Sequence, residues 1–255
     1  MTTTRSAPSG LRRPADVFRL ALINPNTDEL HTRAMCDVAA AALPEGSHVT
    51  AVTPERGPSS IESEADAVVA AAEVLALARS LPAHDGYLIA CFGDPGLDAV
   101  REVTDAPVVG IGEAAYTAAA LVAKRFGIVT TLPRSIPALE ESLAARGMSP
   151  RCAGILPLHI PVAEQGSHHP DTTPAIVEAG RRLVSDYGAE ALILACGGMA
   201  DVAREVEEAV GVPVCDGVAF GAMLAYSLAQ CGLRTSSVGA YAAPEPIPYT
   251  GMPVG

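Results

Sequence analysis

The sequence predicts an α/β protein made of two similar lobes, each a doubly wound parallel sheet, related by a pseudo-twofold axis. Three observations support this fold class: short apolar runs alternate with longer helical stretches, the pattern repeats after about a hundred residues, and 49% of the 255 residues are hydrophobic while only 4% are aromatic. Strand–helix alternation is typical of parallel sheets with helices on both faces. A chain of this length can bury one large core or two smaller ones.

The expected elements follow in order after an irregular start. The first 16 residues are rich in Ser, Thr, Pro, Gly and Arg without periodicity, which predicts a disordered leader at 1–16. Strands are expected at "FRLALI" 18–23, "YLIAC" 87–91, "FGIVT" 126–130 and "ALILAC" 191–196. Helices are expected at 64–80, 138–147 and 172–188.

An internal repeat divides the chain into halves. Cys91 and Cys196 are 105 residues apart, as are Ile23 and Ile128, and segment 105–124 parallels 211–230 with one inserted residue. We expect a first lobe at 17–112, completed by 217–255, and a second lobe at 113–216. Ligands in open α/β sheets bind at the carboxyl ends of the strands. The repeat therefore predicts an active site in the cleft between the lobes.

Each half carries a cysteine at the end of an apolar run, in "ACFGDPG" 90–96 and "ACGGMAD" 195–201. A helix beginning there would favour the thiolate and bring the cysteine pKa from ~8.5 toward neutrality. The following glycines let backbone N–H groups approach a bound carbonyl. A single buried cysteine is commonly an inert small hydrophobe. A pair at equivalent positions of a repeat instead favours a shared site.

Charge and composition exclude several functions. The net charge of −12 argues against a nucleic-acid partner. No secretory signal or membrane-spanning run is recognised, and the six dispersed cysteines are typical of reduced thiols, so we expect a cytoplasmic protein. The histidines at 159, 168 and 169 lack a ligand pattern, and we expect no metal. "GIGEAA" 110–115 is an incomplete dinucleotide loop, and no cofactor is expected.

Five motifs together resemble a known family: "INPNT" 23–27, "ACFGDPGL" 90–97, "RFGIVTTLPR" 125–134, "ACGGMA" 195–200 and "VPVCDGV" 212–218. In this order, and over nearly the whole chain, they are similar to the hydantoin and allantoin racemases of the aspartate/glutamate racemase superfamily. The resemblance implies a cofactor-independent racemase in which Cys91 and Cys196 act as two bases, one removing the proton α to a carbonyl and the other returning a proton. Inverting a carbon acid does require an acid and a base on opposite faces. The two titrations would then be coupled.

The resemblance also implies substrate contacts. Pro25 and Asn26 would line the site, with the Asn26 amide bonding the ring, although Asn is also an ordinary helix N-cap. Thr130 and Thr131 would bind a carbonyl through a hydroxyl or a backbone N–H, although β-branched residues also simply end strands well.

The residues after the two cysteines complete the expected site. Gly93, Gly197 and Gly198 belong to the loops expected to hold the ring carbonyls and N–H groups, and Phe92 either packs over the ring or belongs to the core. Asp94 is expected to cap a helix and to oppose a nearby thiolate. The chain departs from the family in the 163–171 loop, which has "AEQGSHH" in place of an acidic run, and this leaves substrate choice open.

Two alternatives remain beside racemisation of allantoin or a 5-substituted hydantoin. One is a decarboxylase or cis–trans isomerase of the same superfamily, but the arylmalonate decarboxylases keep only one of the two cysteines. The other is a two-lobed module that binds a small acid without chemistry, which thiol reactivity would distinguish. Alanine-rich surfaces predict a homo-oligomer.

Overall fold

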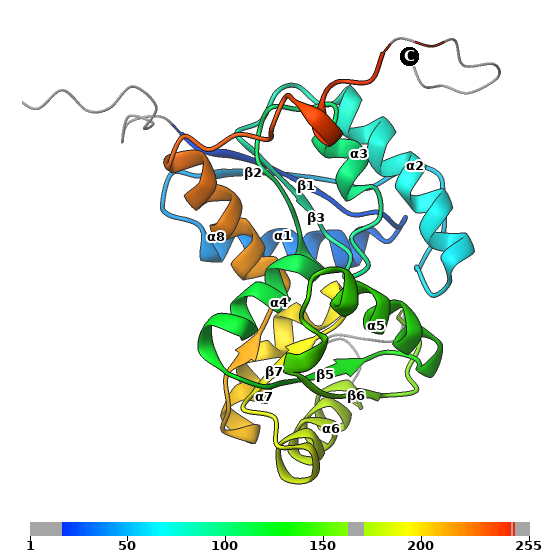
Figure 1. Ribbon diagram of the computed structural model, residues 1–255, viewed down its shortest axis with the longest axis vertical. Helices are drawn as coiled ribbons and strands as arrows, with labels where there is room; N and C mark the ends of the chain where they lie inside the picture. The colour runs from blue at the N-terminus through cyan, green and yellow to red at the C-terminus, as the bar shows by residue number, and fades with distance from the viewer. Residues whose placement is uncertain (1–16, 163–170, 246, 248–255) are drawn as a thin grey trace, which may run out of the picture.

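The computed structural model describes residues 17–162, 171–245 and 247, and it contains two parallel sheets (Figure 1). The predicted leader at 1–16 and residues 163–170 of the histidine-containing loop lie outside this range. The first sheet has the order β2-β1-β3-β4, with β1 Arg19–Ile23, β2 His48–Val52, β3 Gly86–Ile89 and β4 Val108–Gly110. The second has the order β6-β5-β7-β8, with β5 Phe126–Thr130, β6 Cys152–Pro157, β7 Ala191–Leu194 and β8 Val214–Cys215. The identical orders confirm the predicted fold class.

The helices alternate with these strands. They are α1 Glu29–Ala42, α2 Glu64–Ser80, α3 Leu97–Arg101, α4 Ile111–Val122, α5 Ile136–Ala145, α6 Thr172–Tyr187, α7 Ala203–Val210 and α8 Gly217–Gln230. Short 3-10 helices are η1 Pro133–Ser135, η2 Ser149–Arg151, η4 Gly197–Val202 and η5 Gly239–Tyr241. The three helices predicted from the sequence correspond to α2, α5 and α6, with bounds that differ by two residues at most.

The repeat is real, but its spacing differs by one residue between strands. The N–H of Ala90 donates to the carbonyl of Ile23, and the N–H of Ala195 donates to that of Val129, so Ile23 corresponds to Val129 at a spacing of 106. Ile23 and Ile128, paired in the sequence comparison, point to different sides: Ile23 packs beneath α2 and α3, whereas Ile128 packs beneath α4 and α5. A slip of one residue reverses the face of every side chain in a strand. The spacing of 105 holds for β3 and β7, which precede the cysteines.

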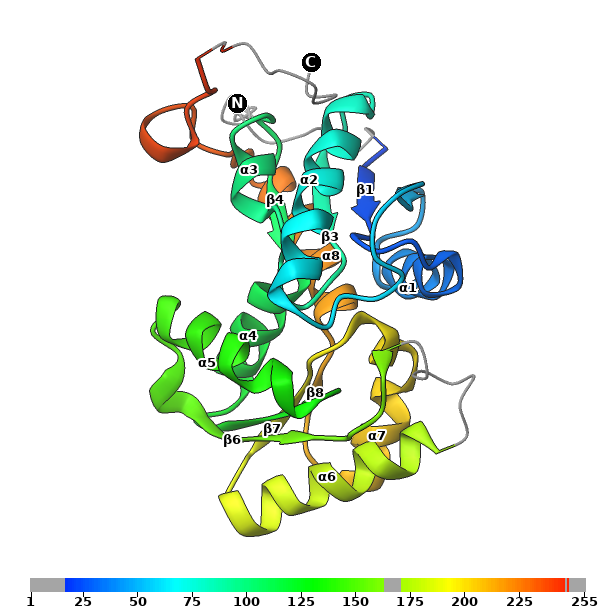
Figure 2. The same cartoon turned by 90° about the vertical axis from the view of Figure 1, so that its right-hand side faces the viewer.

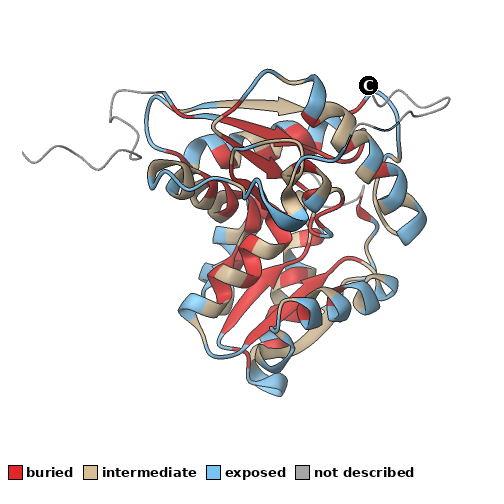
Figure 3. Ribbon diagram, turned by 45° about the horizontal axis from the view of Figure 1, so that its top comes forward, coloured by how far each residue is buried: buried red, intermediate tan, exposed pale blue. Residues whose placement is uncertain are grey.

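Each sheet is covered on both faces (Figure 3). In the first sheet, Leu20 and Leu22 pack with α1 and α8, while the alternate residues Ala21 and Ile23 pack with α2 and α3. In the second, the equivalent faces pack against α4 with α5 and against α6 with α7. Strands buried on both faces explain the nearly continuous apolar runs in the sequence.

Helices α4 and α8 each follow a strand of one sheet and pack against the other sheet (Figure 2). Helix α4 follows β4 but contacts β7 and β8, and α8 follows β8 but contacts β3 and β4. The two helices also contact each other. We retain as a proposal the lobe limits 17–112 with 217–255 and 113–216, which this packing supports. None of the helices in the described ranges is long and apolar enough to span a membrane.

Candidate active site

A cavity of about 820 Å³ lies between the two lobes and collects nearly all the site residues expected from the sequence. Its wall includes Asn26, Cys91, Phe92, Gly93, Thr130, Thr131, Cys196, Gly197 and Gly198. Pro25 is buried, and it is not part of this wall. A second groove, between α1 and α2 beside β2, contains none of the expected residues.

Cys91 and Cys196 enter the cavity from equivalent positions. Cys91 follows β3 by two residues and Cys196 follows β7 by two residues, and both are free thiols that retain partial exposure. The parallel strands end at this edge of their sheets, so the fold directs one thiol from each half into the same space. The two groups are close enough that a charge on Cys196 raises the pKa of Cys91.

The expected lowering of the thiol pKa values is wrong. Burial raises the pKa of Cys91 to about 12 and that of Cys196 to about 11, although backbone N–H groups of Gly93 and Gly198 act in the opposite direction. No α-helix begins directly after either cysteine: α3 starts only at Leu97 and η4 is a 3-10 helix. Desolvation therefore outweighs the backbone dipoles. Burial thus favours the protonated form of both thiols at neutral pH.

The turn after β1 is built by side-chain amides. Asn26 Oδ1 accepts hydrogen bonds from Asn24 Nδ2 at 2.8 Å and from the N–H of Asp28 at 3.0 Å. Asp28, and not Asn26, is the N-cap of α1, because its carboxylate accepts from the N–H groups of Leu30 and His31. Among the described residues, none accepts a hydrogen bond from Asn26 Nδ2, so this donor is free for a ligand in the cavity.

Thr130, Thr131 and Phe92 each have both a structural position and a place in the cavity wall. Thr130 ends β5 and Thr131 follows it, and both are buried while still lining the cavity. Phe92 also lines the cavity, yet it is only 5% exposed and packs edge-on against Tyr116 at 5.3 Å between ring centroids. It belongs to the core and to the cavity wall at once.

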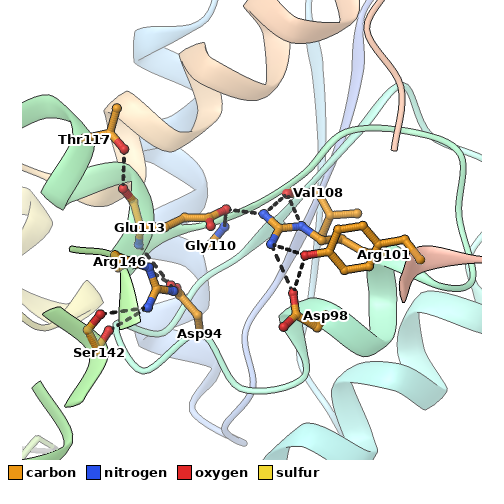
Figure 4. Close-up of polar contacts among 11 residues, drawn as sticks. Asp94, Asp98, Arg101, Val108, Gly110, Glu113, Thr117, Ser142 and Arg146 are labelled. Atoms are coloured by element: carbon orange, nitrogen blue, oxygen red, sulfur yellow. Dashed lines mark hydrogen bonds and ion pairs between the residues drawn. The ribbon is translucent and has the colours of Figure 1, made fainter. Parts of the chain in front are cut away.

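Asp94 is a cap, as expected, but of a different helix (Figure 4). Its Oδ1 accepts from the N–H of Gly112 and its Oδ2 from the N–H of Glu113, both at 2.9 Å, at the start of α4. Arg146, the residue after α5, donates to Asp94 Oδ2 at 3.1 Å and to Ser142 Oγ at 2.8 Å. Burial raises the pKa of Asp94 to about 7.

Sequence reasoning missed several residues of the cavity wall. His31 faces the cavity from α1, with Nδ1 3.1 Å from Asp28 Oδ2, and a Cβ on Gly198 would lie 3.1 Å from its Nε2. Glu62 and Arg146 also line the cavity. None of them follows a strand of the repeat, and the residue pattern around them carries no signal.

The described part of the chain contains no group of three or more His, Cys, Asp or Glu side chains that could hold a metal ion. His159 is exposed, and His168 and His169 lie outside the described residues.

Known proteins resemble this chain along most of its length. The family model for the Asp/Glu/Hydantoin racemase family matches residues 20–225. A hydantoin racemase of Paenarthrobacter aurescens is 38% identical over 91% of this chain and 100% of its own length, and one of Pseudomonas sp. (strain NS671) is 37% identical over 92% and 95%. The solved structure of an allantoin racemase from Klebsiella pneumoniae is 38% identical and superposes with a TM-score of 0.88, covering 92% of this chain and 96% of that one. With its two lobes and its cysteine-lined cavity, the chain therefore belongs to the Asp/Glu/Hydantoin racemase family of isomerases.

Proposed function

We propose that this protein is a cofactor-independent racemase that inverts the carbon α to a ring carbonyl of allantoin or a 5-substituted hydantoin, with Cys91 and Cys196 as the two bases. The observation that supports this most directly is the presence of two free thiols, from equivalent positions of the repeat, in one cavity between the lobes. The hydantoin and allantoin racemases that resemble the chain support the ring substrate.

In the proposed reaction one of the two cysteines has first lost its proton to solvent. This thiolate takes the proton from the ring carbon, and the electron pair of the C–H bond moves into an enolate. The opposite thiol gives its proton to the other face of that carbon and becomes the thiolate. Each turnover thus exchanges the roles of the two sulfurs and needs no cofactor. A thiol of raised pKa forms a strong base once ionised, which suits the weak acidity of the substrate.

The surrounding residues supply the remaining contacts. The loops that contain Gly93 and Gly198 line the cavity, so their backbone N–H groups can donate to a developing oxyanion, and Asn26 Nδ2 can donate to a ring carbonyl. Apolar side chains from two helices line the same cavity, Ala67, Val68 and Ala71 on α2 and Ala138 and Leu139 on α5. We assign this apolar wall to the substituent on the ring.

The test is incubation with single enantiomers of allantoin and of hydantoins with different 5-substituents, followed by optical rotation and mass spectrometry in D₂O. The proposal expects loss of rotation from either enantiomer, with deuterium appearing first in the product while the remaining substrate stays protiated. A single mobile base would return the original proton or label both enantiomers alike. A chain that binds these rings without changing their rotation would be a binding module, and release of CO₂ from a malonate would indicate a decarboxylase.

Single serine variants extend the test. Abstraction and return on one face need only one base, so each variant should still exchange the hydrogen of the one enantiomer that its remaining thiol reaches. Cys91→Ser and Cys196→Ser should therefore prefer opposite enantiomers in residual exchange. Equal preferences above the rate without enzyme would contradict the assignment of one thiol to each face.

A further inference from the structure

Asp94 joins three segments that are distant in the sequence. Its own N–H donates to the carbonyl of Cys91 at 2.9 Å, its carboxylate accepts from the first turn of α4, and Arg146 reaches it from the end of α5 (Figure 4). The side chain is only 4% exposed. Its backbone has φ of 49°, a left-handed conformation that is uncommon among non-glycine residues, although Asp tolerates it better than most.

A buried carboxylate beside a reactive thiol has an electrostatic consequence. A negative charge on Asp94 opposes ionisation of Cys91 three residues away, and this influence is recorded in the raised pKa of the thiol. The Arg146 guanidinium, on the other side of the carboxylate, neutralises this charge at 3.1 Å. Arg146 is itself fixed by Ser142 and stacks over the Tyr116 ring, 5.9 Å from its centroid.

The other charges around this ion pair are accounted for by their own partners. Glu113 on α4 faces Asp94 and disfavours its ionisation, but Glu113 is paired with Arg101 of α3. Cys91 is influenced by Cys196 and Asp94. Arg146 is therefore the cation that meets the Asp94 carboxylate directly.

We propose that Asp94 and Arg146 are positioning residues for Cys91, with Asp94 holding the loop in place and Arg146 cancelling the carboxylate charge so that the thiol can ionise. The pair links the Cys91 loop of the first lobe to the end of α5 in the second. This inference rests on the proposed role of Cys91 as a base.

The experiment measures alkylation of individual cysteines by iodoacetamide as a function of pH, with each labelled peptide quantified by mass spectrometry. Arg146 lowers the pKa of Asp94, so its loss raises that pKa above about 7, and the comparison is made at a pH high enough to keep Asp94 ionised. There, Cys91 in Arg146→Gln should react about tenfold more slowly than in the parent, because the carboxylate charge beside it is no longer compensated. Cys196 should change less than about twofold, since it does not face Asp94. Arg146→Lys, which keeps the charge, should restore most of the rate, and the double variant Asp94→Asn with Arg146→Gln should return Cys91 to within about threefold of the parent.

A matched control is Arg151→Gln. Arg151 also belongs to the second lobe and donates to the carbonyls of Ala123 and Lys124 at the opposite end of α4, so its loss should leave both alkylation rates unchanged. Equal slowing of Cys91 and Cys196 in Arg146→Gln, or slowing of Cys91 in the control, would make the effect merely structural and overturn the proposal. An unchanged alkylation rate of Cys91 in Arg146→Gln would also overturn the proposal.

Steady-state kinetics distinguish this role from substrate binding. The proposal expects Arg146→Gln to lower kcat with KM within about twofold, whereas a raised KM at constant kcat would make Arg146 a ligand for substrate and overturn it. If Arg146→Gln does not fold, the variants Arg146→Lys and Asp94→Asn are compared with each other. The alkylation rate of Cys91 should then be higher in Asp94→Asn than in Arg146→Lys. Alkylation does not require turnover. Absence of racemisation with the predicted alkylation pattern would therefore contradict the proposed function and leave this inference standing.

Discussion

The Cys91 loop and the Cys196 loop occupy equivalent positions of the repeat, but they are closed by different chemistry. Helix α5 of the second lobe closes the Cys91 loop through the Arg146–Asp94 ion pair. Helix α1 of the first lobe closes the Cys196 loop by close packing, because a Cβ on Gly197 would lie 2.5 Å from Met35 Sδ. The repeat preserves which helix covers which thiol, whereas the contact itself has diverged. The two thiols are therefore not interchangeable.

Among variants that test the difference between the two loops, the largest effect on activity is expected from removal of either thiol. Cys91→Ser and Cys196→Ser should each lower racemisation by ~10²–10⁴-fold, the usual contribution of a general acid–base group. Initial rates measured from both enantiomers would check it, with Cys36→Ser as a control because Cys36 lies in the groove outside the cavity. Full activity in either site variant would make that thiol a bystander.

A second prediction concerns the glycines at the starts of α4 and α8. A Cβ on Gly112 would overlap the carbonyl oxygen of Phe92, and one on Gly217 would overlap that of Ile111. Because moving these backbone carbonyl groups would disturb the surrounding packing, Gly112→Ala and Gly217→Ala should each lower the free energy of unfolding by about 3 kcal/mol. Urea denaturation would measure this.

The matched substitution for these glycines is Gly93→Ala. A Cβ at Gly93 meets no atom within 4 Å, so the free energy of unfolding should change by less than about 0.5 kcal/mol. Equal costs at all three positions would show that close backbone approach is not what selects glycine at 112 and 217.

The third prediction compares the thiols directly. Burial raises the pKa of both thiols, and the charges of Cys196 and Asp94 further disfavour ionisation of Cys91. Alkylation of Cys196 should therefore be faster than that of Cys91, by about a few-fold, and both rates should rise with pH as the protons leave. The exposed Cys231 is an internal reference. Faster alkylation of Cys91 than of Cys196 would contradict this prediction.

The smallest expected effect belongs to the turns that follow the central strands. Thr131→Val keeps the shape of the side chain and removes the hydroxyl, so kcat/KM should fall about fivefold, the worth of one neutral hydrogen bond, without loss of stability. Thr130→Val provides the comparison in the same turn. Unchanged kcat/KM in both variants would leave the backbone N–H as the contact with the substrate.

The sequence predicted four of the eight strands found in the described residues (β1, β3, β5 and β7), three helices and the position of both cysteines at strand ends, because these depend on local patterns. Apolar runs such as 191–196 and the helical stretch 64–80 are set by periodicity, and they appear at nearly the expected bounds. The family resemblance added the ring substrate class, which stays a prediction. The domain limits and the roles of Cys91 and Cys196 stay predictions, as do the homo-oligomeric state and the cytoplasmic location.

What the sequence could not predict depends on contacts between distant segments. A helix start directly after each cysteine would lower the pKa of its thiol, but burial in the assembled cavity raises both pKa values. Arg146 is 52 residues from Asp94, and nothing local indicates that they meet. The structure pairs Ile23 with Val129 and not with Ile128. This shift of one residue follows from the strand register, which only the hydrogen bonds between strands define.

The exchange of α4 and α8 between the sheets has a consequence for synthesis on the ribosome. The first sheet is translated early, but Val218, Ala222 and Ala225 of α8 complete the burial of Leu20, Leu22 and Leu88. These apolar side chains stay without their full cover until about residue 230 has emerged, after the second sheet is complete. The first half therefore cannot complete its fold before the second half has been synthesised. The core of the first sheet is therefore completed only late in synthesis, and a nascent chain that stalls in the second half would expose apolar side chains to chaperones.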